Sequence, residues 1–554
     1  MRRTGGRRKC IGTRRAELAH YPGIVSTLGD GTVREVSFAL LRQLGLTTVF
    51  GNPGSTEMPM LRDFPDDFTY VLGLQEGAVL SMAEGYAKGT GGAVLVNLHT
   101  APGLGNAMGA MVTAFQGRAP LVVTAGQQDR RQLASEPFLS GKLVELAAPY
   151  VKWAHEPARA EDVPAALERA YHTALQAPRG PVFVSVPMDD WDAQVPAHAA
   201  REVSYRSAPD PAAMRRVAEL LRSSRRPAIV AGADHDRAGE GGSLQALAER
   251  LGAAVWAEPF AGEASFPQDH PLFQGHLAPA QKPLGEQLAA YDLVLVVGAP
   301  VFAYYPYVPG PTVAPGTQVV QLTADPAEAA RALTGSSVVG DVGLGLEALL
   351  DELPHERRAG PPLRPAPELP RRADPMPVAW VLHELSERMP DGAILVEEAP
   401  STKGDLHTHV RIGRAGTYHT TASGGLGYAL PAAVGLKLAR PDTAVVCVVG
   451  EGSAMYTPQA IWTAVRHGAA VCFVVLNNSH YGILKSFGDL LGTDGVPGLD
   501  VPGIDVISLA RGFGCGGERV AHSQELAQAL ERALSADAPY VLDVVIDPAI
   551  TQLV

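Results

Sequence analysis

The sequence predicts an α/β protein of three domains, each built on a doubly wound parallel sheet. Short apolar runs rich in Val and Ile alternate along the 554 residues with longer segments of helical character. Uninterrupted apolar strands are expected where helices cover both faces of a sheet, and strand–helix alternation implies parallel pairing. Eleven such runs are too many for one twisted sheet, so we expect about three sheets.

The expected strands are separated by stretches long enough to hold a helix, as parallel connections require. In chain order they cover residues 48–50, 93–97, 121–125, 182–186, 228–231, 293–297, 319–322, 394–396, 445–449, 471–476 and 541–546.

Domain boundaries are expected at two breaks in this pattern. The chain turns polar and rich in Pro and Ala after the strand at 182–186, and eight prolines lie between Pro354 and Pro377, which indicates an extended linker. We therefore predict a basic N-terminal extension at 1–29, domains at 30–192, 208–352 and 377–554, and a proline-rich linker at 353–376.

Composition excludes several classes of protein. Lys and Arg number 46 against 58 Asp and Glu, and the net charge of −12 has the wrong sign for a general nucleic-acid binder. The four cysteines form no CxxC pair, and Cys447 and Cys472 lie in Val-rich runs, so we expect buried thiols rather than a zinc or redox site.

Neither a membrane span nor a signal peptide is predicted. No clean run of 18 apolar residues occurs, and the basic first fifteen residues are not followed by an apolar stretch. A disordered tail or a start codon placed too early explains these fifteen residues better than a transit sequence does. We predict a soluble, cytoplasmic protein.

The third domain carries the strongest local signal for a ligand site. The strand at 445–449 leads into Gly450-Glu451-Gly452-Ser453 and a helical stretch at 457–466, and the next strand ends at Asn477-Asn478. This spacing brings Glu451 and Asn478 to the carboxyl ends of adjacent strands, where open α/β sheets bind ligands. Glycines at a helix N-terminus suit an anion, and carboxylate and amide oxygens suit Mg²⁺. The pattern predicts a diphosphate–Mg²⁺ site rather than a plain glycine turn and an Asn cap.

Three polar side chains follow strands of the first domain: Ser55 in a tight turn, Glu76 at a strand end and His99 after the strand at 93–97. Taken singly, each has a plainer explanation, as a turn hydroxyl, a carboxylate at a helix N-terminus or a structural imidazole. Together, at one edge of one sheet, they suggest a site.

These motifs resemble those of the thiamine-diphosphate-dependent 2-oxo acid decarboxylases and carboligases, and within that family the benzoylformate decarboxylases. The resemblance spans about residues 30–548 and is carried by segments 49–79, 96–110, 120–128, 181–192, 293–302, 424–436 and 496–505. It implies the thiamine-diphosphate-binding fold in the order pyrimidine-binding domain (30–192), central domain (208–352) and diphosphate-binding domain (377–554).

The resemblance also implies thiamine diphosphate and Mg²⁺ as cofactors, with a role for each matching residue. Glu76 would shift the aminopyrimidine ring to its imino form, Leu426 would bend the cofactor into a V, and the carbonyl of Gly424 would contact the ring. Ser55 would hold the substrate carboxylate, and His99 would act on the carbonyl oxygen or the enamine. The implied metal ligands are Glu451, Asn478 and the carbonyl of His480. The other implied cofactor contacts are Asn52, Pro53, Gly54, Ser401, Gly450, Gly452, Ser453, Tyr481 and Gly482. The implied substrate pocket holds Phe138, Leu139, Thr420, Ile483 and Phe487.

In this family Glu76 and the diphosphate site of one cofactor come from different subunits. The resemblance therefore implies a homodimer as the smallest catalytic unit, and we expect a homotetramer.

Four positions depart from the family pattern. Tyr305 replaces a second catalytic histidine, and a phenol transfers protons poorly near neutral pH, where imidazole titrates. Glu451 replaces an aspartate, Thr420 an aromatic pocket residue, and Pro400 a hydroxyl residue beside Ser401. The change to Tyr305 favours a slower release of aldehyde. The change to Thr420 favours a roomier or more polar pocket.

The predicted reaction is the non-oxidative decarboxylation of an aromatic or bulky 2-oxo acid to an aldehyde and CO₂ by a carboxy-lyase. An alternative is a carboligase, acetolactate synthase-like or benzaldehyde lyase-like, that joins an acyl anion to a second carbonyl compound. A non-catalytic scaffold with the same fold is the third possibility. A flavin is not predicted, because residues 208–352 contain no dinucleotide-binding fingerprint.

Overall fold

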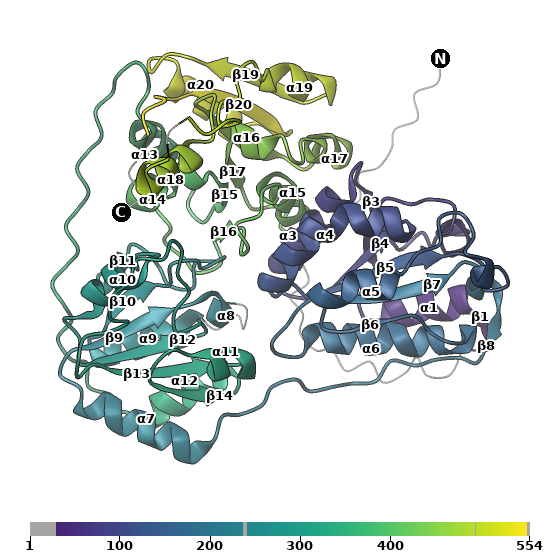
Figure 1. Cartoon of the computed structure of the whole chain (residues 1–554), viewed down its shortest axis with the longest axis horizontal. Helices are drawn as coiled ribbons and strands as arrows, with labels where there is room; N and C mark the ends of the chain where they lie inside the picture. Colours follow the sequence, from purple (N-terminus) through teal and green to yellow (C-terminus); the bar gives the residue numbers. More distant parts are fainter. Residues whose placement is uncertain (1–28, 237–240, 494, 551–554) are drawn as a thin grey trace.

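The computed structural model describes residues 29–236, 241–493 and 495–550, which form three α/β domains around three sheets of six parallel strands (Figure 1). The predicted fold class is confirmed. The sheets lie at residues 48–187, 227–339 and 394–545, and the exact domain boundaries stay a prediction. Nearly all of the predicted extension at 1–29 lies outside the described residues.

The first domain has the strand order β3-β2-β4-β5-β7-β6. Its sheet strands are β2 (Thr48–Gly51), β3 (Thr69–Leu72), β4 (Val94–Leu98), β5 (Leu121–Gln127), β6 (Ala154–His155) and β7 (Val182–Pro187), beside a small antiparallel pair of β1 (Gly31–Thr32) and β8 (Gln194–Val195). Its helices are α1 (Val33–Gln43), α2 (Met58–Leu61), α3 (Glu76–Thr90), α4 (Thr100–Gln116), α5 (Leu143–Ala147) and α6 (Val163–Leu175).

The central domain has the strand order β11-β10-β9-β12-β13-β14. Its strands are β9 (Pro227–Ala231), β10 (Ala254–Ala257), β11 (Phe273–His276), β12 (Leu293–Val297), β13 (Gln318–Thr323) and β14 (Ser336–Val339). Its helices are α7 (Pro211–Ser223), α8 (Ala233–Asp236), α9 (Gly241–Leu251), α10 (Gln281–Leu288), α11 (Pro326–Arg331) and α12 (Val342–Glu352).

The third domain has the order β16-β15-β17-β18-β20-β19, the same plan as the first domain. Its strands are β15 (Ile394–Glu398), β16 (Tyr418–Thr420), β17 (Val445–Gly450), β18 (Val471–Asn477), β19 (Gly516–Val520) and β20 (Tyr540–Val545). Its helices are α13 (Val378–Arg388), α14 (Lys403–His409), α15 (Ala429–Ala439), α16 (Glu451–Ala454), α17 (Gln459–His467), α18 (Gly482–Leu491), α19 (Val506–Gly512) and α20 (Leu526–Leu534).

All eleven predicted strands are present, with ends shifted by one or two residues. The sheet strands that the sequence pattern missed are β10 and the six edge strands, β3, β6, β11, β14, β16 and β19. Edge strands have one neighbour and are often short, so their sequences lack the long apolar run on which the prediction depended. Cys447, Cys472 and Cys515 are free and buried, as expected for Cys447 and Cys472.

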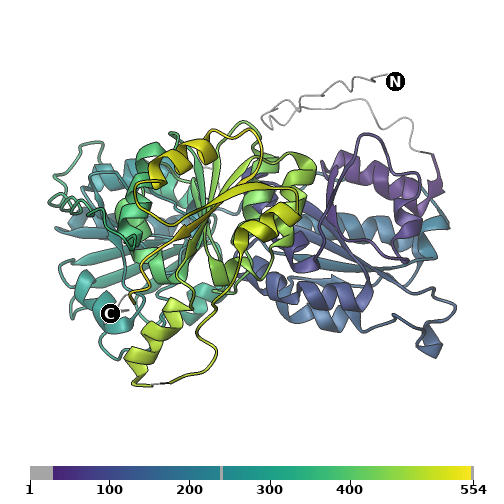
Figure 2. The same cartoon turned by 90° about the horizontal axis from the view of Figure 1, so that it is seen from above.

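The first and third domains pack through α3 and α15, which lie side by side in Figure 1. A Cβ atom at Gly85 would meet the carbonyl oxygen of Ala432 at 2.1 Å, and one at Gly435 would meet that of Met82 at 1.9 Å. Glycine at both positions therefore allows the two helix backbones to touch. In the view from above, the first domain lies beside the other two rather than over them (Figure 2).

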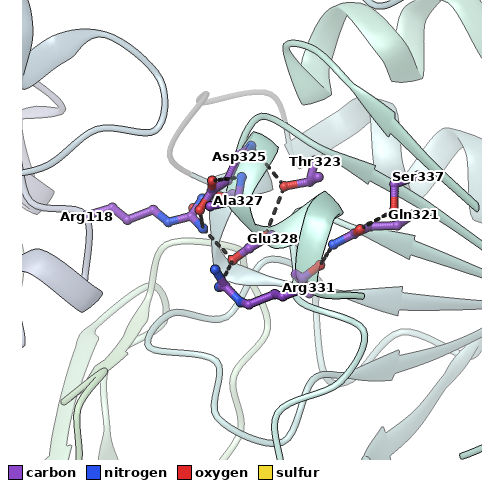
Figure 3. A network of polar contacts seen from close by, with 10 residues as sticks. Arg118, Gln321, Thr323, Asp325, Ala327, Glu328, Arg331 and Ser337 are labelled. Atoms are coloured by element: carbon purple, nitrogen blue, oxygen red, sulfur yellow. Dashed lines mark hydrogen bonds and ion pairs between the residues drawn. The ribbon is translucent and has the colours of Figure 1, made fainter. Parts of the chain in front are cut away.

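Arg118 joins the first domain to the central domain (Figure 3). Its guanidinium is only 12% exposed, lies 3.0 Å from Asp325, and also pairs with Glu328 and Asp234. Three carboxylates offset the burial of one cation, so this contact ties the turn after α4 to the segments that follow β9 and β13. None of the helices among the described residues has the length and apolar character needed to cross a membrane.

Candidate active site

The carboxyl end of β2 forms a turn that holds His99 against its backbone. His99 is the residue before α4, and a Cβ atom at Gly54 would lie 2.2 Å from its Nδ1. Glycine at position 54 is therefore required for the imidazole to pack here. Nδ1 lies 2.7 Å from Oε2 of Glu57 and 3.2 Å from the hydroxyl of Thr56. The ring is 22% exposed, whereas Glu57 is buried.

Glu57 is the residue of this site that sequence reasoning missed. Its carboxylate also accepts hydrogen bonds from the backbone N–H groups of Gly54 and Gly126 and from the Thr56 hydroxyl, each at 2.8 Å. A carboxylate fixed in this way favours the tautomer with the proton on Nδ1, which leaves Nε2 able to accept a proton. The turn sequence Gly54-Ser55-Thr56-Glu57 gave no signal for this role, because only the structure shows that Glu57 is buried and faces His99.

Glu76 opens α3, four residues after β3 ends, with Gln75 as the N-cap. Its Oε2 accepts a hydrogen bond of 3.1 Å from Asn106 of α4, a partner that the sequence did not indicate. A Cβ atom at Gly103 would lie 3.1 Å from Oε1, so the small residue leaves room for the carboxylate. Ser55 lies exposed in the turn after β2. The structure thus places Ser55, Glu76 and His99 after neighbouring strands, as predicted.

Glu451 begins α16 directly after β17, and its side chain is buried. Burial raises the pKa of this carboxyl, and the backbone N–H groups of Glu451, Asn478 and His480 oppose the rise. Its Oε1 has no hydrogen-bond partner. A buried carboxylate oxygen without a hydrogen-bond partner fits a hard divalent cation such as Mg²⁺, so Glu451 suits this site although it is one methylene longer than aspartate.

The segment after β18 brings several predicted residues together. Ser479 has a φ of +62°, and this left-handed turn lets the Asn478 side chain accept the N–H of His480 at 3.3 Å. The His480 carbonyl accepts the N–H of Gly482 at 3.0 Å and keeps a second lone pair. A Cβ atom at Gly482 would lie 3.2 Å from Ser401, so α18, β18 and the start of α14 converge here.

The glycine turn packs closely against the segment that follows β18. A Cβ atom at Gly452 would lie 2.5 Å from the ring of Tyr481, and Ser453 is buried beside it in α16. Gly450 is the N-cap of α16. Across the domain, Gly424 has a φ of +73° and Leu426 is half-buried.

The predicted pocket residues divide into two groups. Tyr305 packs on Phe487 with ring centroids 5.1 Å apart, and Ile483 lies on the same helix, α18. Phe138 and Leu139 come from the first domain, and Phe138 is 88% exposed. Thr420 donates its hydroxyl to buried Glu397 at 3.0 Å, so its polarity is already satisfied within the protein.

The two halves of the predicted site lie in different domains, at strand ends of the first and third sheets. Among the described residues, no hydrogen bond or ion pair connects Ser55, Glu76 or His99 with Glu451, Asn478 or His480. Asn52 and Pro53 are half-buried in the first of these halves.

Comparison with known families accounts for most of the chain. Three family models match in order: the thiamine pyrophosphate enzyme N-terminal TPP-binding domain over residues 31–146, the central domain over 214–349 and the C-terminal TPP-binding domain over 401–544. The order agrees with the predicted one.

Individual relatives are similar over nearly their full length. Benzoylformate decarboxylase of Pseudomonas aeruginosa is 44% identical over 519 residues, which cover 93% of this chain and 98% of the relative. The crystal structure of benzoylformate decarboxylase from Polynucleobacter necessarius superposes with a TM-score of 0.92 at 43% identity, over 94% of this chain and all of that one. A 4-hydroxybenzoylformate decarboxylase of Rhodococcus jostii gives 0.90 at 44% identity, with the same coverage.

Proposed function

Because this chain belongs to the thiamine pyrophosphate enzyme family, we propose that its substrate is benzoylformate or a ring-substituted benzoylformate. The chain is a thiamine-diphosphate-dependent 2-oxo acid decarboxylase, a carboxy-lyase, as the sequence predicted. One observation supports an aromatic substrate. Relatives that are 43–44% identical, and matched over nearly their whole length, are named for benzoylformate or its 4-hydroxy derivative.

The residues present fit the cofactor. When bound, thiamine diphosphate would supply a nucleophilic carbon for the substrate carbonyl and a cationic thiazolium ring as the sink for the electron pair left by departing CO₂. We propose that Glu451, Asn478 and the His480 carbonyl hold Mg²⁺, which the unsatisfied Oε1 of Glu451 supports. Ser453, Tyr481 and Gly482 would line the diphosphate, together with Ser401, Gly450 and Gly452.

The first domain would supply the acid–base groups. Glu76 would hold a proton at the aminopyrimidine, and its hydrogen bond to Asn106 orients the carboxylate. His99 would exchange a proton with the substrate oxygen through Nε2 while Glu57 keeps the other proton on Nδ1. Ser55, exposed in the turn, would bind the substrate carboxylate. Phe138, Leu139, Ile483 and Phe487 would enclose an aromatic ring.

The substrate is tested by incubating the enzyme, thiamine diphosphate and Mg²⁺ separately with benzoylformate, 4-hydroxybenzoylformate and pyruvate. We expect CO₂ and the corresponding aromatic aldehyde from the first two acids, with a kcat/KM at least tenfold above that for pyruvate. Release of CO₂ from pyruvate alone would contradict the aromatic assignment.

We further propose that the working enzyme is at least a homodimer, and expect a homotetramer. Two observations support a second copy: no polar contact among the described residues links the halves of the site, which lie in different domains, and Phe138 and Tyr305 are 88% and 63% exposed although apolar. Co-expression of a Glu76→Gln chain with a Glu451→Ala chain tests this. If the halves come from different chains, hybrid dimers contain one intact site and activity returns; if they come from one chain, no activity returns. The predicted cytoplasmic location stays a prediction.

A further inference from the structure

Glu398, the last residue of β15, is a buried carboxylate bonded entirely to backbone N–H groups. It is 1% exposed, its Oε1 accepts the N–H of Gly427 at 2.7 Å, and its Oε2 accepts those of Tyr428 and Ala429, also at 2.7 Å. A buried carboxylate is costly unless such donors surround it. The first residue of α15 and the two residues before it therefore depend on this side chain.

These contacts lie at one end of the loop at 421–428, which carries Gly424 and Leu426. Gly427 has a φ of +97° and is held from both sides, because the Thr457 hydroxyl donates to its carbonyl at 3.0 Å. At the other end, Ser423 is 2.8 Å from the hydroxyl of Thr113. The intervening residues bond within the loop, where Thr421 donates to the Gly425 carbonyl at 3.1 Å. The position of Leu426 is thus set by the anchors at the loop ends.

We infer that Glu398 is a positioning residue that acts through Gly427 to hold Leu426 and Gly424 in the shape the cofactor needs. The inference rests on the proposed function, since it takes the cofactor contacts of Gly424 and Leu426 from there. Glu398 itself need not touch the cofactor. The geometry is specific because the two carboxylate oxygens have different partners, so that Oε1 holds the loop and Oε2 holds the helix.

Glu398→Gln separates the contact with the loop from the contact with the helix. An amide has one acceptor oxygen, which is best placed toward the two N–H groups of Tyr428 and Ala429, so its NH₂ group faces the N–H of Gly427. Calorimetric titration of the cofactor-free protein with thiamine diphosphate at saturating Mg²⁺ should show a Kd raised about 10- to 100-fold, the range expected for one lost buried hydrogen bond. At saturating cofactor, kcat should fall while the KM for benzoylformate stays within about twofold.

Glu168→Gln is the matched control. Glu168 is a buried carboxylate of α6 in the first domain that also accepts a backbone N–H, from Arg201. It should lose stability without any change in the cofactor Kd. A wild-type Kd and kcat in Glu398→Gln, or an equal Kd rise in Glu168→Gln, would overturn the inference.

If Glu398→Gln fails to fold, Thr457→Val tests the same loop end, because it removes the other bond to Gly427 at nearly constant volume. Its Kd should rise in the same direction, and an unchanged Kd would overturn the inference. The titration involves no substrate. A wild-type enzyme that binds the cofactor but does not decarboxylate benzoylformate would therefore contradict only the proposed substrate. A wild-type protein that binds no thiamine diphosphate would overturn both.

Discussion

The Nδ1 atom of His99 lies 2.7 Å from a buried oxygen of Glu57, so the tautomer of the imidazole is fixed by a residue 42 positions earlier in the chain. The carboxylate is itself held by two backbone N–H groups and a hydroxyl, so it is rigid as well as charged. A histidine oriented in this way presents one nitrogen for proton exchange and keeps the other occupied.

Glu57→Gln should therefore lower kcat about 100-fold, the low end for loss of acid–base assistance. The amide can offer the Nδ1–H group an oxygen, but its NH₂ group would then face backbone donors. Steady-state CO₂ release measures the effect, and the Kd for thiamine diphosphate serves as the control because it should not change. Wild-type turnover in this variant would show that the pair is structural only.

Tyr305→His should shift the products toward free aldehyde. Tyr305 is exposed beside Phe487, and imidazole titrates near neutral pH whereas the phenol does not. With excess benzaldehyde as acceptor, chiral chromatography should show a smaller share of 2-hydroxyketone than the present enzyme yields. An unchanged ratio would mean that position 305 does not control protonation of the product. Tyr307→His, at an exposed neighbouring position, is the control.

Lys88→Met should destabilise the junction of the three domains by about 3–5 kcal/mol, the usual loss when one partner of a buried ion pair is removed. The ammonium is buried, lies 3.1 Å from Glu84 and 3.5 Å from Glu263 of the central domain, and donates to Tyr428 at 2.9 Å. Denaturant unfolding measures the loss. Arg42→Met breaks an exposed pair with Asp67 and should change the unfolding free energy by under about 1 kcal/mol.

Two buried histidines whose rings are in contact between the central and third domains should make the protein sensitive to acid. The rings of His276 and His407 lie 3.7 Å apart, burial lowers the pKa of His276 to about 3 and that of His407 well below 6.5, and Lys403 and Arg364 add to the effect on His276. Neutral rings are favoured in the folded state, so this stability is fully present above about pH 6.5 and is lost as the pH falls toward 3.

His407→Phe keeps a ring at this contact and removes one proton site. The fall in unfolding free energy between pH 6.5 and 4 should then be shallower by up to about 1.4 kcal/mol per pH unit. His355→Gln, at an exposed site in the linker, should leave the slope as it is. An unaltered slope in His407→Phe would contradict the role of this histidine pair.

By itself, the sequence determined the elements that local patterns encode. Interior strands buried on both faces need a continuous apolar run, so all of them except β10 were predictable. The glycines and oxygen ligands at strand ends of the third domain likewise follow a local pattern, from which the diphosphate site was predicted. The family resemblance added the order of the domains and the roles proposed for Glu76 and Leu426.

Only the tertiary structure decided which side chains support these residues. Glu57 meets His99 across 42 residues, Glu398 meets Gly427 across 29, and Lys88 meets Tyr428 across 340. In the sequence such residues look like ordinary turn, strand or helix residues, because no local period or spacing encodes a contact between separate elements. Burial makes them important, since a charge removed from water must find its partners in whatever segment the fold brings beside it.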